Sequence, residues 1–171
     1  AAALLTTEAL RLEKAGAEVI AMTTNTMHKC ATAVVAALRT PFLHIVDPLA
    51  RHLGADGRKR PLLLATRFTM EDRFFIERLE ARGLQPIVPS PEGRTELHRI
   101  IYEELCHGIV KADATQVARE LVADAAGLGA DSVILGCTEI CMLIQPGTVA
   151  LPAYDTTTIH ATALVDFSLS D

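Results

Sequence analysis

The chain has 171 residues, half of them hydrophobic, and a formal net charge of −5 at pH 7. A chain of this length and composition can bury a substantial core as one domain or two small lobes. Its 16 Lys and Arg are mixed with 21 Asp and Glu, and it has two Tyr, five Phe and no Trp. It therefore offers neither a basic stripe nor stacking platforms for nucleic acid. No apolar run reaches the roughly 20 residues that a membrane-spanning helix needs.

The first residues, AAALLTTEALRLEKAG, predict an amphipathic helix. They lack the basic start, apolar centre and cleavage site of a signal peptide, so we expect a cytoplasmic protein. In that compartment the cysteines are expected to be reduced, and those outside the candidate site, Cys30, Cys106 and Cys141, to be structural. Cys137 and Cys141 have no second ligand pair, and a structural zinc ion needs four ligands. No metal site is predicted.

Short apolar runs alternate with helical patterns along the chain, which predicts an α/β fold with mostly parallel strands and right-handed crossovers. Apolar runs bounded by Gly, Pro or Asp are typical of strands, and apolar residues at three- and four-residue spacing are typical of helices. Strands are predicted at 18–23, 42–46, 61–66, 84–88, 132–135 and 149–153. Helices are predicted at 27–38, 48–53, 70–82, 94–108, 114–127 and 157–168.

An internal near-repeat relates two parts of the chain. AGAEVIAMTTNT (15–26) aligns with LGADSVILGCTE (128–139), so that Gly16 matches Gly129 and Thr24 matches Cys137. Each copy is followed by a strand pattern that ends in Asp, PFLHIVD (41–47) and LPAYD (151–155). The repeat predicts two pseudo-symmetric lobes with mostly parallel sheets flanked by helices. We place the first lobe at residues 1–58 and 154–171, and the second at 59–153.

The register of the repeat places Thr24 and Cys137 at the carboxyl ends of equivalent strands. Ligands of open α/β sheets bind there, close to helix N-termini. If the lobes face each other across a pseudo-twofold axis, the two side chains approach a bound molecule from opposite sides. That geometry suits the transfer of a proton across a stereocentre.

The turn at Cys137 has further features of a reactive site. A helix starting directly after a cysteine lowers the pKa of its thiol, which is normally about 8.5, and favours the thiolate. Gly136 would let the backbone approach a ligand, Thr138 offers an N-cap hydroxyl and Glu139 a first-turn carboxylate. A small buried residue followed by a capping threonine is an equally good interpretation of this position alone.

Four motifs together resemble the aspartate/glutamate racemase family. They are TTNTMHK (23–29), LATRFTME (64–71), ILGCTEI (134–140) and PAYDTTTIHA (152–161). The resemblance extends over nearly the whole chain. It implies a two-lobed α/β enzyme, usually a homodimer, that racemises small acidic amino acids without pyridoxal phosphate or another cofactor. One thiol from each lobe would act as acid and base.

The resemblance also assigns roles to individual residues. Cys137 matches the second family thiol, and Thr24 stands where many members carry the first, as in a subgroup with Thr there. The turns Asn25-Thr26 and Thr138-Glu139 are of the racemase type. The substrate's amino and carboxylate groups would be held by Asn25, Thr26, Thr66, Thr138 and Glu139.

Other residues are secondary candidates. A cation should meet the distal carboxylate, and Arg67 and Lys111 are the candidates, Arg67 because a guanidinium fits a carboxylate with two hydrogen bonds. His160 is expected to line the site and Asp155 to cap the last helix. His28 could tune the site, and a capping or buried role fits it equally well.

The threonine changes the expected chemistry. A threonine hydroxyl is a far weaker acid than a thiol, so we expect lopsided handling of D and L substrates, with Thr24 acting through a water or a neighbouring group. The first lobe is expected to lack its N-terminal segment, because resembling proteins begin with a strand and a Gly-Gly turn that do not precede Ala1. Two alternatives remain open: a related single-thiol decarboxylase or maleate-type isomerase, and a non-catalytic amino-acid-binding remnant.

Overall fold

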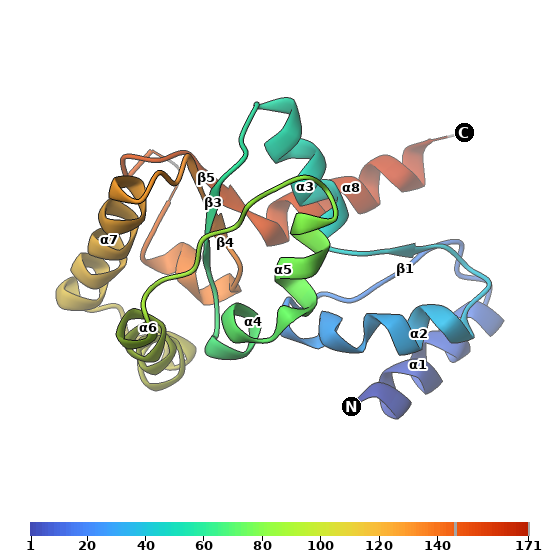
Figure 1. The fold of residues 1–171 in the computed structure, drawn as a ribbon. Helices are drawn as coiled ribbons and strands as arrows, with labels where there is room; N and C mark the ends of the chain where they lie inside the picture. Colours follow the sequence, from blue (N-terminus) through green and yellow to red (C-terminus); the bar gives the residue numbers. More distant parts are fainter. Residues whose placement is uncertain (146, 171) are drawn as a thin grey trace.

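The computed structural model describes residues 1–145 and 147–170 (Figure 1). The α-helices are α1 (Ala2–Lys14), α2 (Ala31–Ala37), α3 (Val46–Ala55), α4 (Arg67–Glu71), α5 (Arg73–Glu80), α6 (Pro91–Glu103), α7 (Ala112–Gly127) and α8 (Thr156–Leu169). The strands are β1 (Ile20–Ala21), β2 (Phe42–Leu43), β3 (Pro61–Leu64), β4 (Ser132–Leu135) and β5 (Ala153–Asp155). Short 3-10 helices are η1 (Thr26–Cys30), η2 (Leu105–His107) and η3 (Thr138–Met142).

The strands form two separate parallel sheets within the described residues. The larger has the order β3-β4-β5, with Leu63 opposite Ile134 and Ile134 opposite Tyr154. The smaller pairs β1 with β2 through two residues of each strand. The prediction of an α/β fold with parallel sheets flanked by helices is confirmed.

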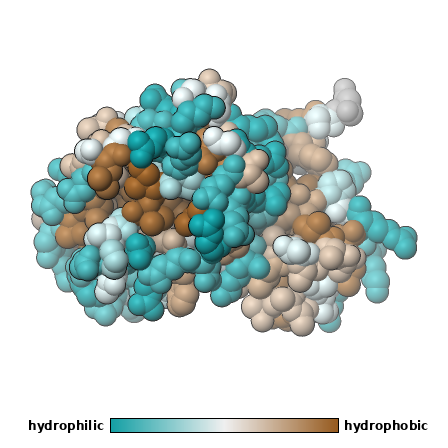
Figure 2. Space-filling view, viewed as in Figure 1, coloured by the Kyte–Doolittle hydropathy of each residue, from teal (hydrophilic) through white to brown (hydrophobic). Residues whose placement is uncertain are grey.

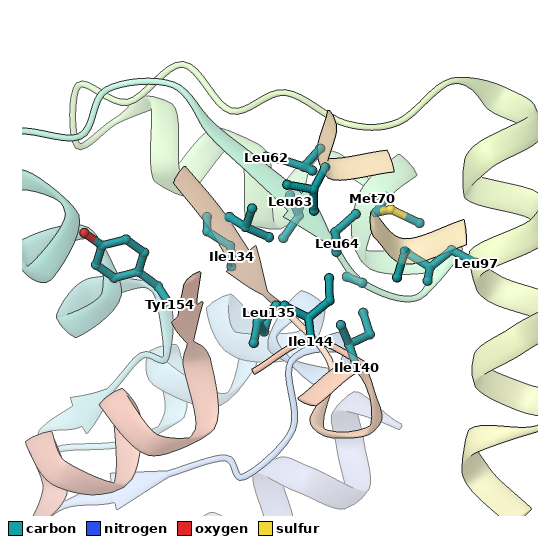
Figure 3. Packing of buried hydrophobic residues seen from close by; sticks show 14 of the residues in the cluster. Leu62, Leu63, Leu64, Met70, Leu97, Ile134, Leu135, Ile140, Ile144 and Tyr154 are labelled. Carbon is teal, nitrogen blue, oxygen red and sulfur yellow. The ribbon is translucent and has the colours of Figure 1, made fainter. Parts of the chain in front are cut away.

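The larger sheet lies in the main hydrophobic core. Every residue of β3 and β4 is buried, as expected for parallel strands covered by helices on both faces. Figure 3 shows Leu62, Leu63 and Leu64 packed with Ile134 and Leu135, and with side chains from the neighbouring helices. Helix α3, placed in the first lobe from the sequence, also packs its apolar residues against this core.

The smaller sheet has much less core around it. Its buried cluster consists of Ala9, Ile20 and Val34, with partly buried neighbours at its margin. Helices α1 and α2 pack on each other at this end of the molecule (Figure 1). Leu4, Leu12 and Val35 are exposed there, and Figure 2 shows apolar surface over these two helices.

The near-repeat corresponds to two equivalent pieces of structure. Helix α1 leads through Gly16 into β1, and α7 leads through Gly129 into β4. The two matched glycines have φ of 91° and 86°, a left-handed conformation that ends each helix and that other residues rarely adopt. The sequence register therefore reproduces the backbone register.

Two predicted strands are corrected by the structure. Residues 84–88 form only an isolated bridge between Leu62 and Ile87, because Pro86 and Pro89 lack the N–H groups that a ladder needs. The strand predicted at 149–153 lies instead at Ala153–Asp155, after Pro152.

Helix boundaries also differ from the prediction. The helix predicted at 70–82 is two helices, α4 and α5, and the one at 27–38 begins as η1. The predicted cap of α8 is confirmed, since the Asp155 carboxylate accepts a hydrogen bond from the Thr157 N–H at 2.9 Å.

Candidate active site

Thr24 and Cys137 line the same cavity, which has a volume of about 220 Å³. Thr24 follows β1 and Cys137 follows β4, so both stand at carboxyl ends of parallel strands. The cavity is lined by Thr23, Thr24, Asn25, Thr26, Thr66, Ile101, Tyr102, Cys106, Gly136, Cys137, Thr138 and Glu139. Seven of the ten residues predicted for the site, drawn from three separate turns, therefore meet around one cavity.

Gly136 lets the end of β4 lie directly against β3. Its N–H donates to the Leu64 carbonyl at 2.7 Å. A Cβ at this position would lie 3.0 Å from a Leu63 methyl carbon and 3.1 Å from both the Ala65 Cβ and the Leu64 carbonyl oxygen. The glycine thus fixes the point at which the chain leaves the sheet and presents Cys137.

The Cys137 thiol is held by the neighbouring carboxylate. Its S–H donates to Glu139 Oε2 at 2.8 Å, and the Thr138 hydroxyl donates to the same oxygen at 2.7 Å. Burial raises the pKa of the Cys137 thiol, and the negative charge and hydrogen bond of Glu139 raise it further. Burial also acts to raise the pKa of Glu139, but the hydrogen bonds from Cys137 and Thr138 hold it below its usual value.

The expected lowering of the Cys137 pKa is therefore wrong. The segment that follows is the five-residue 3-10 helix η3, too short to offset burial and an adjacent carboxylate. The prediction that the Thr138 hydroxyl caps this helix is also wrong, because it donates to Glu139 and makes no cap hydrogen bond. In this structure the thiol is a proton donor with an acceptor already in place.

The turn after β1 is tied to the end of β4 by Asn25. The Asn25 Nδ2 group donates to Thr156 Oγ1 at 3.0 Å, and the Thr156 hydroxyl donates to the Leu135 carbonyl at 2.9 Å. Among the described residues, the Asn25 amide oxygen is buried without a hydrogen-bond partner. An amide oxygen beside the cavity is thus available to accept a hydrogen bond from a bound molecule.

Three threonine hydroxyls meet on another wall of the cavity. Thr26 Oγ1 lies 3.2 Å from Thr66 Oγ1 and 3.1 Å from Thr69 Oγ1, and the last two are 3.3 Å apart. Each hydroxyl can rotate and can both donate and accept. The cluster joins η1 to the start of α4 and can present its donors to an anion. Thr69, fully buried beneath it, was not predicted.

His160, Arg67 and Lys111 lie outside this cavity. His160 lines an adjoining cavity of about 90 Å³ together with Thr24, Asn25 and Thr138. Arg67 lies 3.8 Å from Glu71, and Lys111 lies 3.2 Å from Glu104; both cations are about half exposed. Their contact with a substrate carboxylate stays a prediction.

Three further residues line the cavity and were not predicted from the sequence: Ile101, Tyr102 and Cys106, which come from the end of α6 and from η2. Cys106 was expected to be structural, yet it is exposed and lines the cavity. Tyr102 and Cys106 are four residues apart, so they would share a face of the helix predicted at 94–108. That spacing was the available signal, but it does not say what the face meets.

Within the described ranges, 1–145 and 147–170, all four cysteines are free and no group of three or more His, Cys, Asp or Glu could hold a metal ion. None of the helices in these ranges is long and apolar enough to cross a membrane.

The fold and cavity define an α/β protein with a thiol and a hydroxyl at the carboxyl ends of two equivalent strands. The profile of the Asp/Glu/Hydantoin racemase family matches residues 1–164, and the chain belongs to this family. The family and the structural relatives described next indicate an amino-acid racemase.

Solved structures support the assignment. A candidate Asp/Glu racemase from Yersinia pestis is 42% identical, with a TM-score of 0.95 over 99% of this chain and 74% of that one. An aspartate racemase homologue from Pyrococcus horikoshii OT3 is 35% identical, with a TM-score of 0.91 over the same shares. The broad specificity amino-acid racemase RacX of Bacillus subtilis is 22% identical over 169 residues, 95% of this chain and 70% of that protein.

Proposed function

We propose that this chain racemises aspartate or glutamate by moving the α-proton between Cys137 and Thr24, without a cofactor. The observation that carries the proposal is that both side chains line one cavity from the ends of equivalent strands. A racemase needs an acid and a base on opposite faces of the α-carbon, and the near-repeat supplies one residue from each copy.

The polar walls of the cavity fit the backbone groups of an amino acid. The unpartnered Asn25 amide oxygen is an acceptor for the α-ammonium group. The hydroxyls of Thr26 and Thr66 can turn from one another to donate to the α-carboxylate. We assign the distal carboxylate to Arg67 or Lys111. Arg67 is half exposed in a surface ion pair with Glu71. Lys111 would have to leave the buried carboxylate of Glu104, which would keep its pair with Arg99.

Glu139 gives Cys137 a route to both protonation states. With the thiol protonated, Cys137 can deliver its proton to a planar carbanion. In the reverse direction, the proton moves from Sγ to Glu139 Oε2, 2.8 Å away, and the thiolate then takes the α-proton. The positive charge of the substrate ammonium favours the thiolate and opposes the burial that raises the thiol pKa. Thr24 acts on the other face, through a water or a neighbouring group.

The test is α-proton exchange followed by NMR in heavy water, with D- and L-aspartate and D- and L-glutamate and no added cofactor. We expect exchange in the wild type and its loss in Cys137→Ala. In Thr24→Val we expect racemisation to be lost, with Cys137-dependent exchange still measurable on one face. Cys141→Ala is the matched control, because this thiol lies in η3, four residues after Cys137, and does not line the cavity. Its rate should equal that of the wild type.

Asymmetry between the enantiomers is expected in kcat and KM taken separately. Because the equilibrium constant of a racemisation is one, kcat/KM must be the same in both directions. Deuterium uptake into the remaining substrate, measured before product accumulates, then gives the rate of proton exchange on each face of the α-carbon separately. Binding without exchange would instead identify an amino-acid-binding remnant, and loss of carbon dioxide from phenylmalonate would identify a decarboxylase.

A further inference from the structure

His28 contacts the backbone of the turn that carries Thr24 and Asn25. It lies in η1, four residues after Thr24, and the residue is 2% exposed. Its Nδ1 atom is 2.7 Å from the Thr24 carbonyl oxygen, and its Nε2 atom is 3.2 Å from the Ile45 backbone nitrogen. The ring thus connects the residue proposed as proton carrier to the segment that follows β2.

The two contacts require one protonation state. A carbonyl oxygen can only accept, so Nδ1 carries the ring proton, and a backbone N–H can only donate, so Nε2 carries none. A second proton on Nε2 would point at the Ile45 N–H and break that bond. Burial lowers the pKa of His28 to about 4, in agreement with the geometry. His28 is therefore a neutral imidazole with a fixed tautomer.

The surroundings of the ring keep it in this state. His44 lies edge-on at 4.3 Å between ring centroids and His160 at 6.0 Å. His44 Nδ1 accepts from the Val46 N–H at 3.2 Å, and His160 Nε2 donates to the Leu43 carbonyl at 3.0 Å. The charged groups that face His28 are Arg78 of α5 and Asp47 of α3, which are paired with each other.

The small sheet makes this contact important. Strands β1 and β2 are joined through two residues each, and the cluster beneath them has three buried side chains among the described residues. Such a pair gives the Thr24 turn little support. The bonds of His28 connect the ends of both strands at the edge where the cavity lies.

We propose that His28 is a positioning residue for proton transfer by Thr24: its Nδ1–H, aimed at the Thr24 carbonyl, holds the hydroxyl opposite Cys137. The proposal rests on the racemase function proposed above and deepens it. His28 touches neither substrate nor the reacting atoms, and acts through the backbone of Thr24.

Two conservative variants separate the two contacts of the ring. In His28→Asn the amide N–H takes the place of Nδ1–H and keeps the bond to Thr24. In His28→Gln the amide oxygen reaches the place of Nε2 and keeps the bond to Ile45. The loss of one aligned hydrogen bond corresponds to about a tenfold change in rate. We expect kcat for the Thr24-dependent face to fall about tenfold in His28→Gln, with KM nearly unchanged, and within about threefold of wild type in His28→Asn.

His52→Gln is the matched control. Its Nδ1 atom also contacts the carbonyl four residues earlier, that of Pro48, at 3.0 Å, but it lies in α3 and does not line the cavity. We expect it to match the wild type. If His28→Gln and His28→Asn lose the same activity, or neither loses any, the positioning role is overturned.

A measurement without substrate separates this inference from the proposed function. Long-range ¹H–¹⁵N spectra of the ¹⁵N-histidine-labelled protein should show His28 as the neutral Nδ1–H tautomer down to about pH 5. A charged His28 at neutral pH, or the Nε2–H tautomer, would refute the inference whatever the activity. If the tautomer is found but Thr24→Val exchanges both faces like wild type, the Thr24 mechanism fails and the structural contact stands.

Discussion

The two catalytic turns that line the cavity are held in place by different interactions. Cys137 follows β4, whose four residues are all buried between two paired neighbours in the main core. Thr24 follows β1, which pairs with β2 through two residues over a cluster of three buried side chains in the described chain. The thiol side is thus held by packing, whereas the hydroxyl side is held by hydrogen bonds from His28 and Asn25.

This difference has a physical consequence. Packing in a close-fitting core resists movement in every direction, whereas a few hydrogen bonds fix only the groups they join. Regions with few buried apolar contacts also open locally at lower free energy. We therefore expect the thiol to be the fixed partner in catalysis and the Thr24 turn to be the adjustable one.

The largest expected effect is on catalysis. Replacing Cys137 by Ala removes the proton carrier on the packed side, and α-proton exchange should fall by about 10³-fold, within the range of general acid–base catalysis. Thr24→Val should abolish racemisation to a similar extent while leaving Cys137-dependent exchange on one face measurable. Heavy-water NMR of each enantiomer makes the distinction. Equal residual exchange on both faces in Thr24→Val would remove the distinction between the two sides.

The next effect is on stability. Leu63→Ala opens a cavity among fully buried neighbours of the larger sheet and should lower the free energy of unfolding by about 4 kcal/mol. Ile20→Ala in the smaller cluster should cost about 2 kcal/mol, because its sparser surroundings can collapse into the space. Urea unfolding of both variants tests this. A larger cost for Ile20→Ala would reverse the comparison.

The pH dependence should be concentrated on the Thr24 side. Burial lowers the pKa of His28 to about 4 and that of His44 to about 3. In the unfolded chain both titrate near 6.5, so below that pH the unfolded state binds more protons than the folded state. The free energy of unfolding should therefore fall as pH drops from about 6.5 to about 4, by up to about 1.4 kcal/mol per pH unit for each histidine.

Unfolding titrations of His28→Gln and His44→Gln measure this slope. Each variant should flatten the curve between pH 6 and pH 4. A slope that survives both substitutions would mean that other groups are responsible.

The smallest effect expected is at the ion pair between α3 and α5. Asp47 accepts two hydrogen bonds from Arg78, at 2.9 and 2.7 Å, and one from Arg82 at 2.9 Å. Burial acts to raise the pKa of Asp47, but Arg78 and Arg82 hold it below the usual value. Its contribution is present above the unfolded pKa of about 4 and is lost as pH falls through the lower folded pKa.

Asp47→Asn should lower the free energy of unfolding by about 1 kcal/mol at pH 7, since both arginines are partly exposed. The difference between the Asn variant and wild type should shrink as pH falls below about 4. Loss of several kcal/mol at pH 7 would show that this pair contributes as much as the core.

Much of the fold was predictable because it depends on local patterns. The apolar runs at β3 and β4 can be satisfied only by burial on both faces, and Gly16 and Gly129 mark helix ends that need positive φ. The strand predicted at 84–88 forms only an isolated bridge, because Pro86 and Pro89 lack the N–H donors that a ladder needs.

The candidate site divides in the same way. The near-repeat and motifs brought Thr24, Asn25, Thr26 and Cys137 together correctly, since turns after parallel strands share one edge of a fold. Tyr102 and Cys106 could not be found this way, because they reach the cavity from the end of α6 and from η2, whose positions depend on the packing of the whole core.

The class of fold, the family and the turns that form the site all follow from the order of residues, because periodicity, helix-ending glycines and an internal repeat can be recognised along the chain. The chemistry of individual groups depends instead on the folded arrangement. The pKa of Cys137 is raised by burial and by Glu139, His28 is fixed as a neutral tautomer between Thr24 and Ile45, and Asn25 retains an open acceptor. Each of these depends on which polar atoms meet in space and how much water is excluded, and no spacing along the chain records that.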